Sequence, residues 1–389
     1  MAHVVVVGGG VMGSAAAWQL ASRGFAVTLL ERGAAGHTEG SSHGSSRIFR
    51  LAYPDAFYVS LAARALPLWR RLEAESGIEV LSLTGAVDHG PPAAIEALHG
   101  ELRAGGHAAR VLGPEQAAER WPGLRFDTSV LFHAAAGRLH ADRAVLAFQQ
   151  AAAAKGAVVR HGVRVAKLLR HGADKVEVIT TGGEAVTADA AVVAVGGWAP
   201  GLAARSVSGL PPLRVTQEQP VHFPAPDALD WPSFIHHGGA ALAEDSGVYG
   251  LGSEDGVKAG FHAVGPVVDP DQRDRSIDPL ALRQVQEYAE RWLPGVDASA
   301  PTATTCLYTL TPDHDFVVDR DGPVTVLAGF SGHGFKFASV IGELAADLVT
   351  GRPGARRFSL GRTDPARADP ERADLGRTDP ARTDGGKTA

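Results

Sequence analysis

Apolar residues gather in short continuous runs that end on glycine or polar residues, a pattern typical of strands buried on both faces. The first run, His3–Val7, leads directly into GGGVMG at residues 8–13 and then into a helical pattern over about 14–23. A second apolar run, Phe25–Leu30, ends on Glu31. This order predicts a strand–turn–helix–strand unit at the start of the chain.

The glycines of this unit have the spacing of a dinucleotide-binding turn. Gly8 would allow the tight turn, Gly10 the approach of a pyrophosphate to the backbone, and Gly13 close packing of helix and strand. The helix N-terminus offers free N–H groups to the phosphates. Glu31 stands where an acid accepts a hydrogen bond from a ribose hydroxyl. The motif leaves open whether the nucleotide carries nicotinamide or flavin.

Two later apolar runs also end on glycines. Ala190–Val195 closes on Gly196-Gly197-Trp198, and Val324–Leu327 precedes the glycine-rich stretch 329–334 and a helical pattern over 338–350. A nicotinamide dehydrogenase keeps its nucleotide contacts within one contiguous domain, whereas these glycines are spread over the whole chain. The spread therefore favours an extended FAD.

The segments between these units alternate between helical and strand periodicity, which predicts a second domain inserted in pieces. We expect a mixed α/β and α+β fold, with a Rossmann-like FAD-binding domain and an interleaved substrate domain. The FAD-binding domain would comprise residues 1–84, 140–212 and 310–358, and the substrate domain 85–139 and 213–309. Residues 80–87, which cross the first boundary between the two domains, look like one strand. Residues 279–292, within the substrate domain, look like a helix.

The end of the chain has a different composition. LGRTDPAR occurs at 360–367 and again at 375–382, and large apolar residues are almost absent there. Such a segment buries too little surface to order itself, so we expect residues 359–389 to form a disordered tail.

Composition and charge narrow the partners. The net charge of −6 gives no basic surface for nucleic acid, and no apolar run is long enough for a membrane span. The start of the chain lacks the basic region of a signal peptide, and Cys306 as the only cysteine suits a reducing compartment, so we expect a cytoplasmic protein. The 16 histidines show no zinc-binding spacing, and the adjacent His236 and His237 are interpreted as core or surface residues, with no metal expected.

Beyond the N-terminal glycines, four stretches carry a family resemblance: GSSHGSSRIFRLAY at 40–53, DGVKAGFHAVG at 255–265, CLYTLTPDHDFVVD at 306–319 and AGFSGHGFKFAS at 328–339. Together they resemble the monomeric sarcosine oxidase and N-methyltryptophan oxidase family, within the D-amino-acid oxidase-like flavoproteins. The resemblance covers about residues 3–358 and implies an FAD-binding domain of the glutathione-reductase type with an interleaved antiparallel-sheet substrate domain. The segment between Ile235 and Tyr249 is longer than is usual in this family, and that from Tyr249 to Lys258 is shorter.

The resemblance implies a covalently held flavin. Cys306 would bind FAD through a thioether at the 8α-methyl, and Arg47, preceded by His43, would lie beside the isoalloxazine ring. Without the resemblance, a lone cysteine is more often an inert small hydrophobe, and Arg47 would equally suit a phosphate or the surface. Further contacts to FAD are expected from Val11, Met12, Arg32, His37, Ser42, Val165, Gly196, Trp198, Gly329, Gly332, His333, Gly334 and Lys336.

The resemblance also implies a substrate site. Arg50 and Lys336 would bind the substrate carboxylate near Gly332, as a guanidinium fork and a point charge. Lys258 would activate oxygen, and His262, four residues on, would share its strand face. Tyr249 and Tyr308 would flank the substrate amine. From the residues alone, Lys258 could equally be a solvent-facing lysine, and the tyrosines could be core residues.

These assignments predict a monomeric FAD-dependent oxidase of small secondary amino acids. Sarcosine or a similar N-methyl amino acid would give an imine, then formaldehyde and the primary amino acid, while O2 is reduced to H2O2. Three alternatives stay open: an oxidase of cyclic or bulkier amines of the pipecolate, proline or N-methyltryptophan type, a flavin dehydrogenase with a non-oxygen acceptor, and a non-enzymatic nucleotide-binding Rossmann protein.

Overall fold

The structure is a computed structural model that describes residues 1–238 and 247–362. Residues 239–246 and 363–389 lie outside the described residues, and with them most of the expected tail and part of the segment between Ile235 and Tyr249. No helix in the described ranges is long and apolar enough to cross a membrane.

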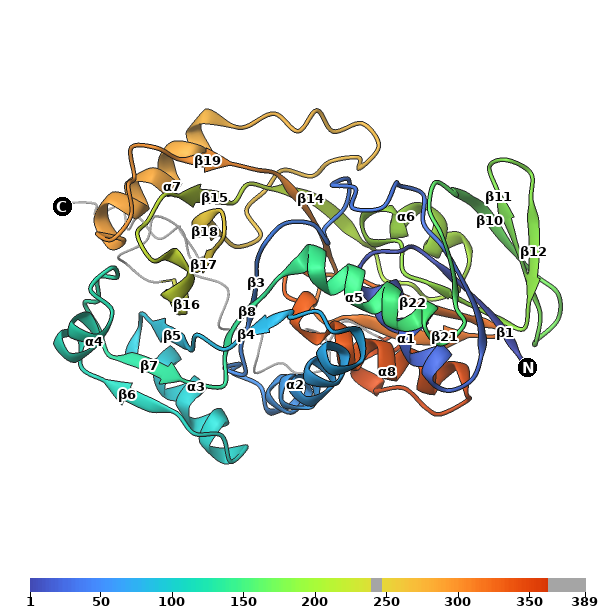
Figure 1. Ribbon diagram of the computed structural model, residues 1–389, viewed down its shortest axis with the longest axis horizontal. Helices are drawn as coiled ribbons and strands as arrows, with labels where there is room; N and C mark the ends of the chain where they lie inside the picture. The colour runs from blue at the N-terminus through green and yellow to red at the C-terminus, as the bar shows by residue number, and fades with distance from the viewer. Residues whose placement is uncertain (239–246, 363–389) are drawn as a thin grey trace, which may run out of the picture.

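A six-stranded sheet forms one end of the molecule, and its strands come from distant parts of the chain (Figure 1). All its neighbours run parallel except the pair β21–β22 at the edge. In spatial order, its strands are β21 (Val317–Asp321), β22 (Val324–Ala328), β13 (Ala190–Val193), β1 (His3–Val7), β2 (Ala26–Leu30) and β9 (Val158–Arg160).

Both faces of this sheet are covered, which explains the continuous apolar run of β1. Val4 and Val6 pack into a cluster with α1 (Val11–Ser22), α5 (Ala141–Ala153) and α8 (Ala338–Val349). Val5 and Val7 pack on the opposite side. That side is covered by a three-stranded sheet of β10 (Val165–Arg170), β11 (Val176–Thr180) and β12 (Ala185–Ala188).

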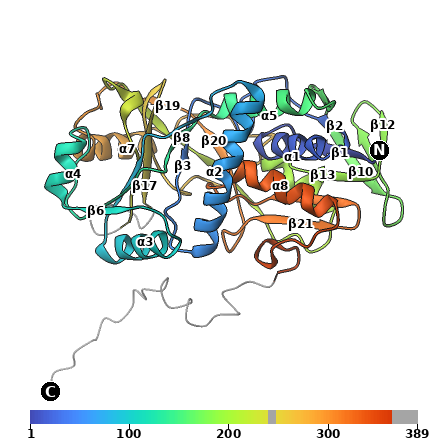
Figure 2. The same ribbon diagram turned by 60° about the horizontal axis from the view of Figure 1, so that its bottom comes forward.

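An eight-stranded sheet forms the other end of the molecule, and α2 (Ala56–Ser76) lies between the two ends (Figure 2). The sheet was expected to be antiparallel, but the central pair β16–β5 runs parallel because β5 comes from an earlier, separate segment. In spatial order, its strands are β19 (Thr302–Ala303), β15 (Val221–Phe223), β18 (Gly256–Phe261), β17 (Val248–Ser253), β16 (Ser233–His236), β5 (Ala86–His89), β7 (Val130–His133) and β6 (Arg110–Leu112).

The remaining elements connect or cover these sheets. Helix α7 (Pro279–Trp292) packs against the eight-stranded sheet. The other elements are α3 (Pro92–Ala104), α4 (Pro114–Arg120), α6 (Ala199–Leu202), the sheet of β3 (Arg47–Phe49), β8 (Gly137–Leu139) and β4 (Leu81–Ser82), the pair β14 (Arg214–Glu218) and β20 (Cys306–Leu310), and the 3-10 helices η1 (Gly196–Trp198), η2 (Ala203–Arg205), η3 (Ala228–Asp230), η4 (Phe335–Phe337) and η5 (Arg356–Phe358).

The single strand expected over residues 80–87 is wrong. The chain forms β4 and β5 instead, in two different sheets, and Gly85 lies between them with a φ of 80°. A Cβ atom on Gly85 would come within 2.6 Å of the Phe132 ring, so this break requires glycine.

The expected start of the tail at residue 359 is too early. The Arg362 guanidinium forms an ion pair of 2.7 Å with Asp313, and the Leu360 amide donates to Asp319 at 2.7 Å. The sequence around residue 360 is polar and shows no nearby interaction partner. The partners of Leu360 and Arg362 lie more than forty residues earlier in the chain.

Candidate active site

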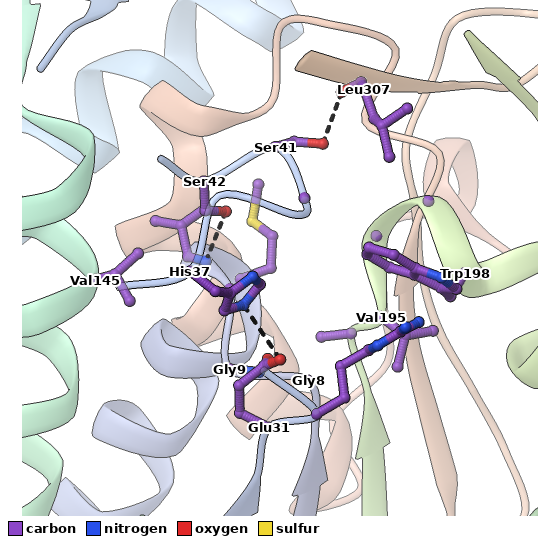
Figure 3. Close-up of a pocket in the computed structure, with 18 of the residues that line it drawn as sticks. Gly8, Gly9, Glu31, His37, Ser41, Ser42, Val145, Val195, Trp198 and Leu307 are labelled. Atoms are coloured by element: carbon purple, nitrogen blue, oxygen red, sulfur yellow. Dashed lines mark hydrogen bonds and ion pairs between the residues drawn. The ribbon is translucent and has the colours of Figure 1, made fainter. Parts of the chain in front are cut away.

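A cavity of about 790 Å³ opens at the carboxyl ends of β1, β2 and β13 (Figure 3). Gly8 turns the chain there with a φ of 103°, which favours glycine. Gly13 lies behind the wall of the cavity, where a Cβ atom would sit 1.9 Å from the Gly8 carbonyl oxygen. The turn therefore brings the N-terminus of α1 to the cavity, and this geometry fits the pyrophosphate of a dinucleotide.

Glu31 is fixed at the wall of this cavity. One carboxylate oxygen accepts a hydrogen bond from the Gly9 amide at 2.6 Å, and the other accepts from the Gly33 amide at 2.7 Å and lies 3.2 Å from Nε2 of His37. Burial works to raise the pKa of Glu31, but these hydrogen bonds outweigh it and lower the pKa. Glu31 is therefore ionised at neutral pH, and its contact to a ribose stays a prediction.

The loop after β2 closes the cavity opposite Trp198. Ser42 accepts a hydrogen bond of 3.0 Å from the Val11 amide at the start of α1, and Arg32 lies 4.4 Å above the Trp198 ring. Figure 3 shows Ser42, His37 and Glu31 on one side of the cavity and Trp198 on the other. The residues proposed for FAD that line this cavity are Gly8, Gly10, Val11, Met12, Glu31, Arg32, His37, Ser42, Arg47, Val165, Gly196, Trp198, Cys306, Gly329, Gly332 and Gly334.

A second cavity of about 690 Å³ adjoins the first. The residues that line both cavities mark their junction; they are Arg47, Cys306, Tyr308, Gly332 and Phe335. The second cavity also collects candidate residues from distant parts of the chain: His43, Arg50, Tyr249, Lys258, His262, His333 and Lys336. An elongated cofactor in the first cavity would reach the candidate substrate residues at this junction.

Lys258 reaches the second cavity from β18. Its ammonium donates to the Ser46 carbonyl at 3.0 Å, and the residue is 6% exposed. Burial, helped by repulsion from Arg47, lowers the pKa of Lys258 to about 7. The Arg47 guanidinium itself donates to the carbonyls of Ser41, His43 and Ser46, so it holds this loop in place.

Lys336 is buried, and in the chain it stands between the apolar residues Phe335 and Phe337. Among the described residues, its ammonium donates to the Tyr53 hydroxyl at 3.0 Å and to the His333 carbonyl at 2.9 Å. Burial, with repulsion from Arg50, lowers the pKa of Lys336 well below its usual range. An anion that enters the cavity beside Lys336 would therefore stabilise its ammonium form.

Arg50 and Lys336 both place their cationic groups against the ring of Tyr53. The Arg50 guanidinium carbon is 5.0 Å from the centre of the Tyr53 ring, while the Lys336 ammonium is 5.5 Å from it. The two cations that were predicted to share a carboxylate thus come together through Tyr53. One Nη atom of Arg50 also donates to Asp88 at 2.8 Å, a partner that the sequence analysis missed.

His262 and the two tyrosines form another part of the second cavity. The His262 ring lies 5.5 Å from that of Tyr308, and burial, followed by repulsion from Lys336, lowers the pKa of His262 to about 4. Burial raises the pKa of Tyr249 and of Tyr308 above the usual range. At neutral pH the imidazole is therefore uncharged and can accept a hydrogen bond, and both phenols remain donors.

Cys306 begins β20, opposite Glu218 of β14. Burial raises the pKa of the Cys306 thiol, against the lowering influence of Arg47 and Lys258. The free thiol is therefore protonated at neutral pH, and its position at the junction is compatible with a bond to a flavin held in the first cavity.

Outside this site, His89, Asp127 and His236 bring possible metal-ligand atoms within 4.8 Å of one another. The two imidazoles are packed as aromatic residues: their ring centres are 4.0 Å apart, and the His236 ring lies 4.5 Å from Trp292. This packing matches the core interpretation of His236, whereas His237 lines the second cavity.

Comparison with known proteins identifies the class. The model of the family "FAD dependent oxidoreductase" matches residues 3–348. The monomeric sarcosine oxidase of Streptomyces avermitilis is 34% identical over 395 residues, covering 94% of this chain and 97% of that protein. For the monomeric sarcosine oxidase of Bacillus sp. (strain NS-129), the identity is 32% over 372 residues, covering 89% and 92%. The chain belongs to this family of FAD-dependent oxidoreductases.

More distant matches extend the comparison. The N-methyl-L-tryptophan oxidase of Yersinia pestis (strain Pestoides F) is 28% identical over 387 residues, covering 92% of this chain and 98% of that protein. The structure of NikD, an amino acid oxidase, aligns with a TM-score of 0.80 at 24% identity, covering 92% and 98%. At that identity the structural likeness shows the fold alone. The expected FAD-binding fold with an interleaved second domain and the expected family are both confirmed.

Proposed function

We propose that this FAD-dependent oxidoreductase oxidises N-methyl amino acids such as sarcosine and passes the electrons to O2. The main support for this proposal is that Arg50 and Lys336 both lie against Tyr53 in the second cavity. This cavity adjoins the first one at Cys306 and Tyr308. The names of the two sarcosine oxidases at 32–34% identity support the same substrate class.

Substrate binding would begin at the two cations. Arg50 offers paired N–H groups to one carboxylate, and Lys336 adds a point charge in a buried site where a charged hydrogen bond is strong. The amine would then face Tyr308, Tyr249 and His262, which line the same cavity. His262 is neutral at physiological pH, so it can accept a hydrogen bond from the substrate amine and orient it. With a pKa of about 4 it does not hold the proton that the substrate ammonium must lose before oxidation, and that proton passes to solvent.

The overall reaction balances as two half-reactions. Bound FAD supplies the acceptor for two electrons and a proton when the C–H bond of the N-methyl group is broken. The resulting imine takes up water to give formaldehyde and the primary amino acid. O2 then takes up two electrons and two protons to give H2O2, and Lys258 would place positive charge where oxygen becomes negative.

An assay of both products tests this function. Purified holoenzyme is incubated with sarcosine, and H2O2 and formaldehyde are measured against glycine and dimethylamine as matched compounds that lack the N-methyl group or the carboxylate. We expect the two products in equal amounts from sarcosine only. Peroxide without formaldehyde, or no turnover of any N-methyl amino acid, would contradict the proposal.

A bulkier secondary amine is the second candidate. The second cavity, at about 690 Å³, lies in the range of roughly 300–1,000 Å³ that pockets for drug-sized ligands occupy. It is larger than sarcosine requires, and one relative is named N-methyl-L-tryptophan oxidase. The same assay with pipecolate, proline and N-methyltryptophan separates the two candidates: a kcat/KM higher for any of these than for sarcosine would favour the bulkier class.

We further propose that Cys306 bonds covalently to the flavin. Its place at the junction of the two cavities supports this. After acid precipitation, we expect the pellet of the wild-type protein to stay yellow and that of Cys306→Ser to be colourless with a yellow supernatant. A colourless wild-type pellet from a protein that was yellow before precipitation would contradict the thioether.

A further inference from the structure

Asp88 is a buried acid behind the candidate carboxylate site. It is 0% exposed, and one carboxylate oxygen accepts from Arg50 and lies next to Nε2 of His237, both at 2.8 Å. The other oxygen has no hydrogen-bond partner among the described residues. Burial works to raise the pKa of Asp88, but Arg50 and His237 outweigh it and lower the pKa. Asp88 is therefore a buried anion paired with the arginine of the site.

The position of Asp88 in the parallel pair β5–β16 determines the face of the sheet from which its side chain projects. His89 and His236 are directly opposite each other in this pair, and their rings pack against Trp292 of α7. Side chains of a strand alternate between the two faces of a sheet, so Asp88 points away from α7. There it meets Arg50, and it also meets His237, which follows β16.

Asp88 fixes the direction of the Arg50 side chain. The hydrogen bond to Asp88 is the only one that Arg50 makes to a described residue, and its guanidinium rests on the Tyr53 ring. One end of the guanidinium is thus held at the sheet, and its remaining N–H groups are left for a ligand in the cavity. Without Asp88, the long side chain would regain rotamer freedom that binding must then remove.

Asp88 also sets the charge of the site. Arg50 contributes one positive charge, and Lys336 contributes another when it is protonated. Asp88 cancels one of these, so a single carboxylate beside Arg50 and Lys336 completes a locally neutral group. The other two cations already placed in the cavity, Arg47 and Lys258, lie outside this group. A second carboxylate beside Arg50 and Lys336 would leave the group with a net negative charge, which is costly in a buried region.

Building on the proposed function, we infer that Asp88 is a positioning residue for Arg50 that restricts the substrate to amines with a single carboxylate. Sarcosine fits this class, whereas iminodiacetate, a secondary amine with two carboxylates, does not. This charge balance gives the enzyme selectivity through repulsion of the wrong substrate.

Two variants separate positioning from charge. Asp88→Asn keeps an oxygen that accepts from Arg50 but removes the charge, so we expect the ratio of kcat/KM for iminodiacetate to that for sarcosine to rise about tenfold, or about 1.4 kcal/mol. Asp88→Ala removes the acceptor as well, so we expect the KM for sarcosine to rise about tenfold with kcat within threefold of wild type. Asp347→Asn, which removes the acid of the Arg23 ion pair between α1 and α8, is the matched control.

A binding measurement keeps the inference independent of turnover. Acetate and malonate are titrated into the oxidised holoenzymes, and binding is followed by the flavin absorbance. We expect Asp88→Ala to weaken acetate binding about tenfold and Asp88→Asn to shift the preference toward malonate, with FAD content and circular dichroism as in wild type. Unchanged acetate affinity in Asp88→Ala, or an unchanged malonate preference in Asp88→Asn, would overturn the inference. Failure of the wild-type enzyme to oxidise any amine would overturn the proposed function instead.

Discussion

Replacing Lys258 with methionine is expected to slow the reaction of the reduced enzyme with O2 by about 10²–10³-fold, the usual cost of losing one preorganised charge or donor. Lys258 is buried and donates to Ser46 in the wall of the second cavity, so its charge is only weakly screened by water. Methionine keeps the length of the side chain without the charge. The rate is measured by reducing the enzyme anaerobically with substrate and mixing it with oxygenated buffer in a stopped-flow spectrometer.

The pH dependence gives an independent check on this lysine. Burial lowers the pKa of Lys258 to about 7, so its ammonium is charged below that pH and neutral above it. The wild-type oxygen reaction should therefore slow as the pH rises through about 7, and Lys258→Met should lose that step. Lys155→Met, which removes a lysine paired with Glu75 outside both cavities, is the control.

The outcome also decides between an oxidase and a dehydrogenase. A wild-type enzyme that reacts slowly with O2 but rapidly with a quinone, and whose oxygen reaction is unchanged in Lys258→Met, would show that this lysine does not serve oxygen. The proposal of O2 as acceptor would then be wrong, while the oxidation of the amine could stand.

Replacing Lys336 with methionine should affect the other half-reaction. We expect the KM for sarcosine to rise about 10- to 100-fold, because a hydrogen bond to a charged group contributes about 1.5–3 kcal/mol. The reaction of the reduced enzyme with O2 should stay within about threefold of wild type. Steady-state kinetics and the stopped-flow reoxidation experiment measure the two effects in the same preparation.

Binding of a carboxylate should also be accompanied by proton uptake at any pH at which part of Lys336 is neutral. Burial and Arg50 hold the pKa of Lys336 well below its usual range, and an anion beside it raises that pKa again. Calorimetric titration of the wild-type holoenzyme with acetate in two buffers of different ionisation enthalpy measures the proton taken up. Equal apparent enthalpies in both buffers at every pH tested would contradict the lowered pKa, and an unchanged KM in Lys336→Met would contradict the assigned role.

The candidate residues that the sequence analysis identified lie in short motifs, in which neighbouring residues of the chain determine the local structure. The turn at Gly8 and its packing against Gly13 depend on backbone conformations within a few residues, so their spacing was visible in the chain. Lys336 was found from its motif, and the structure buries it in the wall of the second cavity. Its partners Tyr53 and His333 were not expected, because one of them lies 283 residues away.

Asp88 shows what the sequence could not reveal. In the chain, it stands between Val87 and His89 and looks like the polar residue of a half-buried strand. The only available signal was an acid in a short, mostly apolar strand, which is common at sheet surfaces. The proposed role of Asp88 depends on the parallel pairing of β5 with β16 and on its hydrogen bond with Arg50, which is 38 residues away.

The sequence by itself determined the glycine turn at the start of the chain and the family, and it supplied the residues that we propose to carry the chemistry, because these depend on local backbone geometry and on short motifs. The tertiary structure decided how the two cavities meet, that Lys336 rests on neutral partners, and that Asp88 is bound to Arg50. These features arise from contacts between distant segments. Their electrostatic effects depend on burial, and burial is a property of the folded chain rather than of any segment of it.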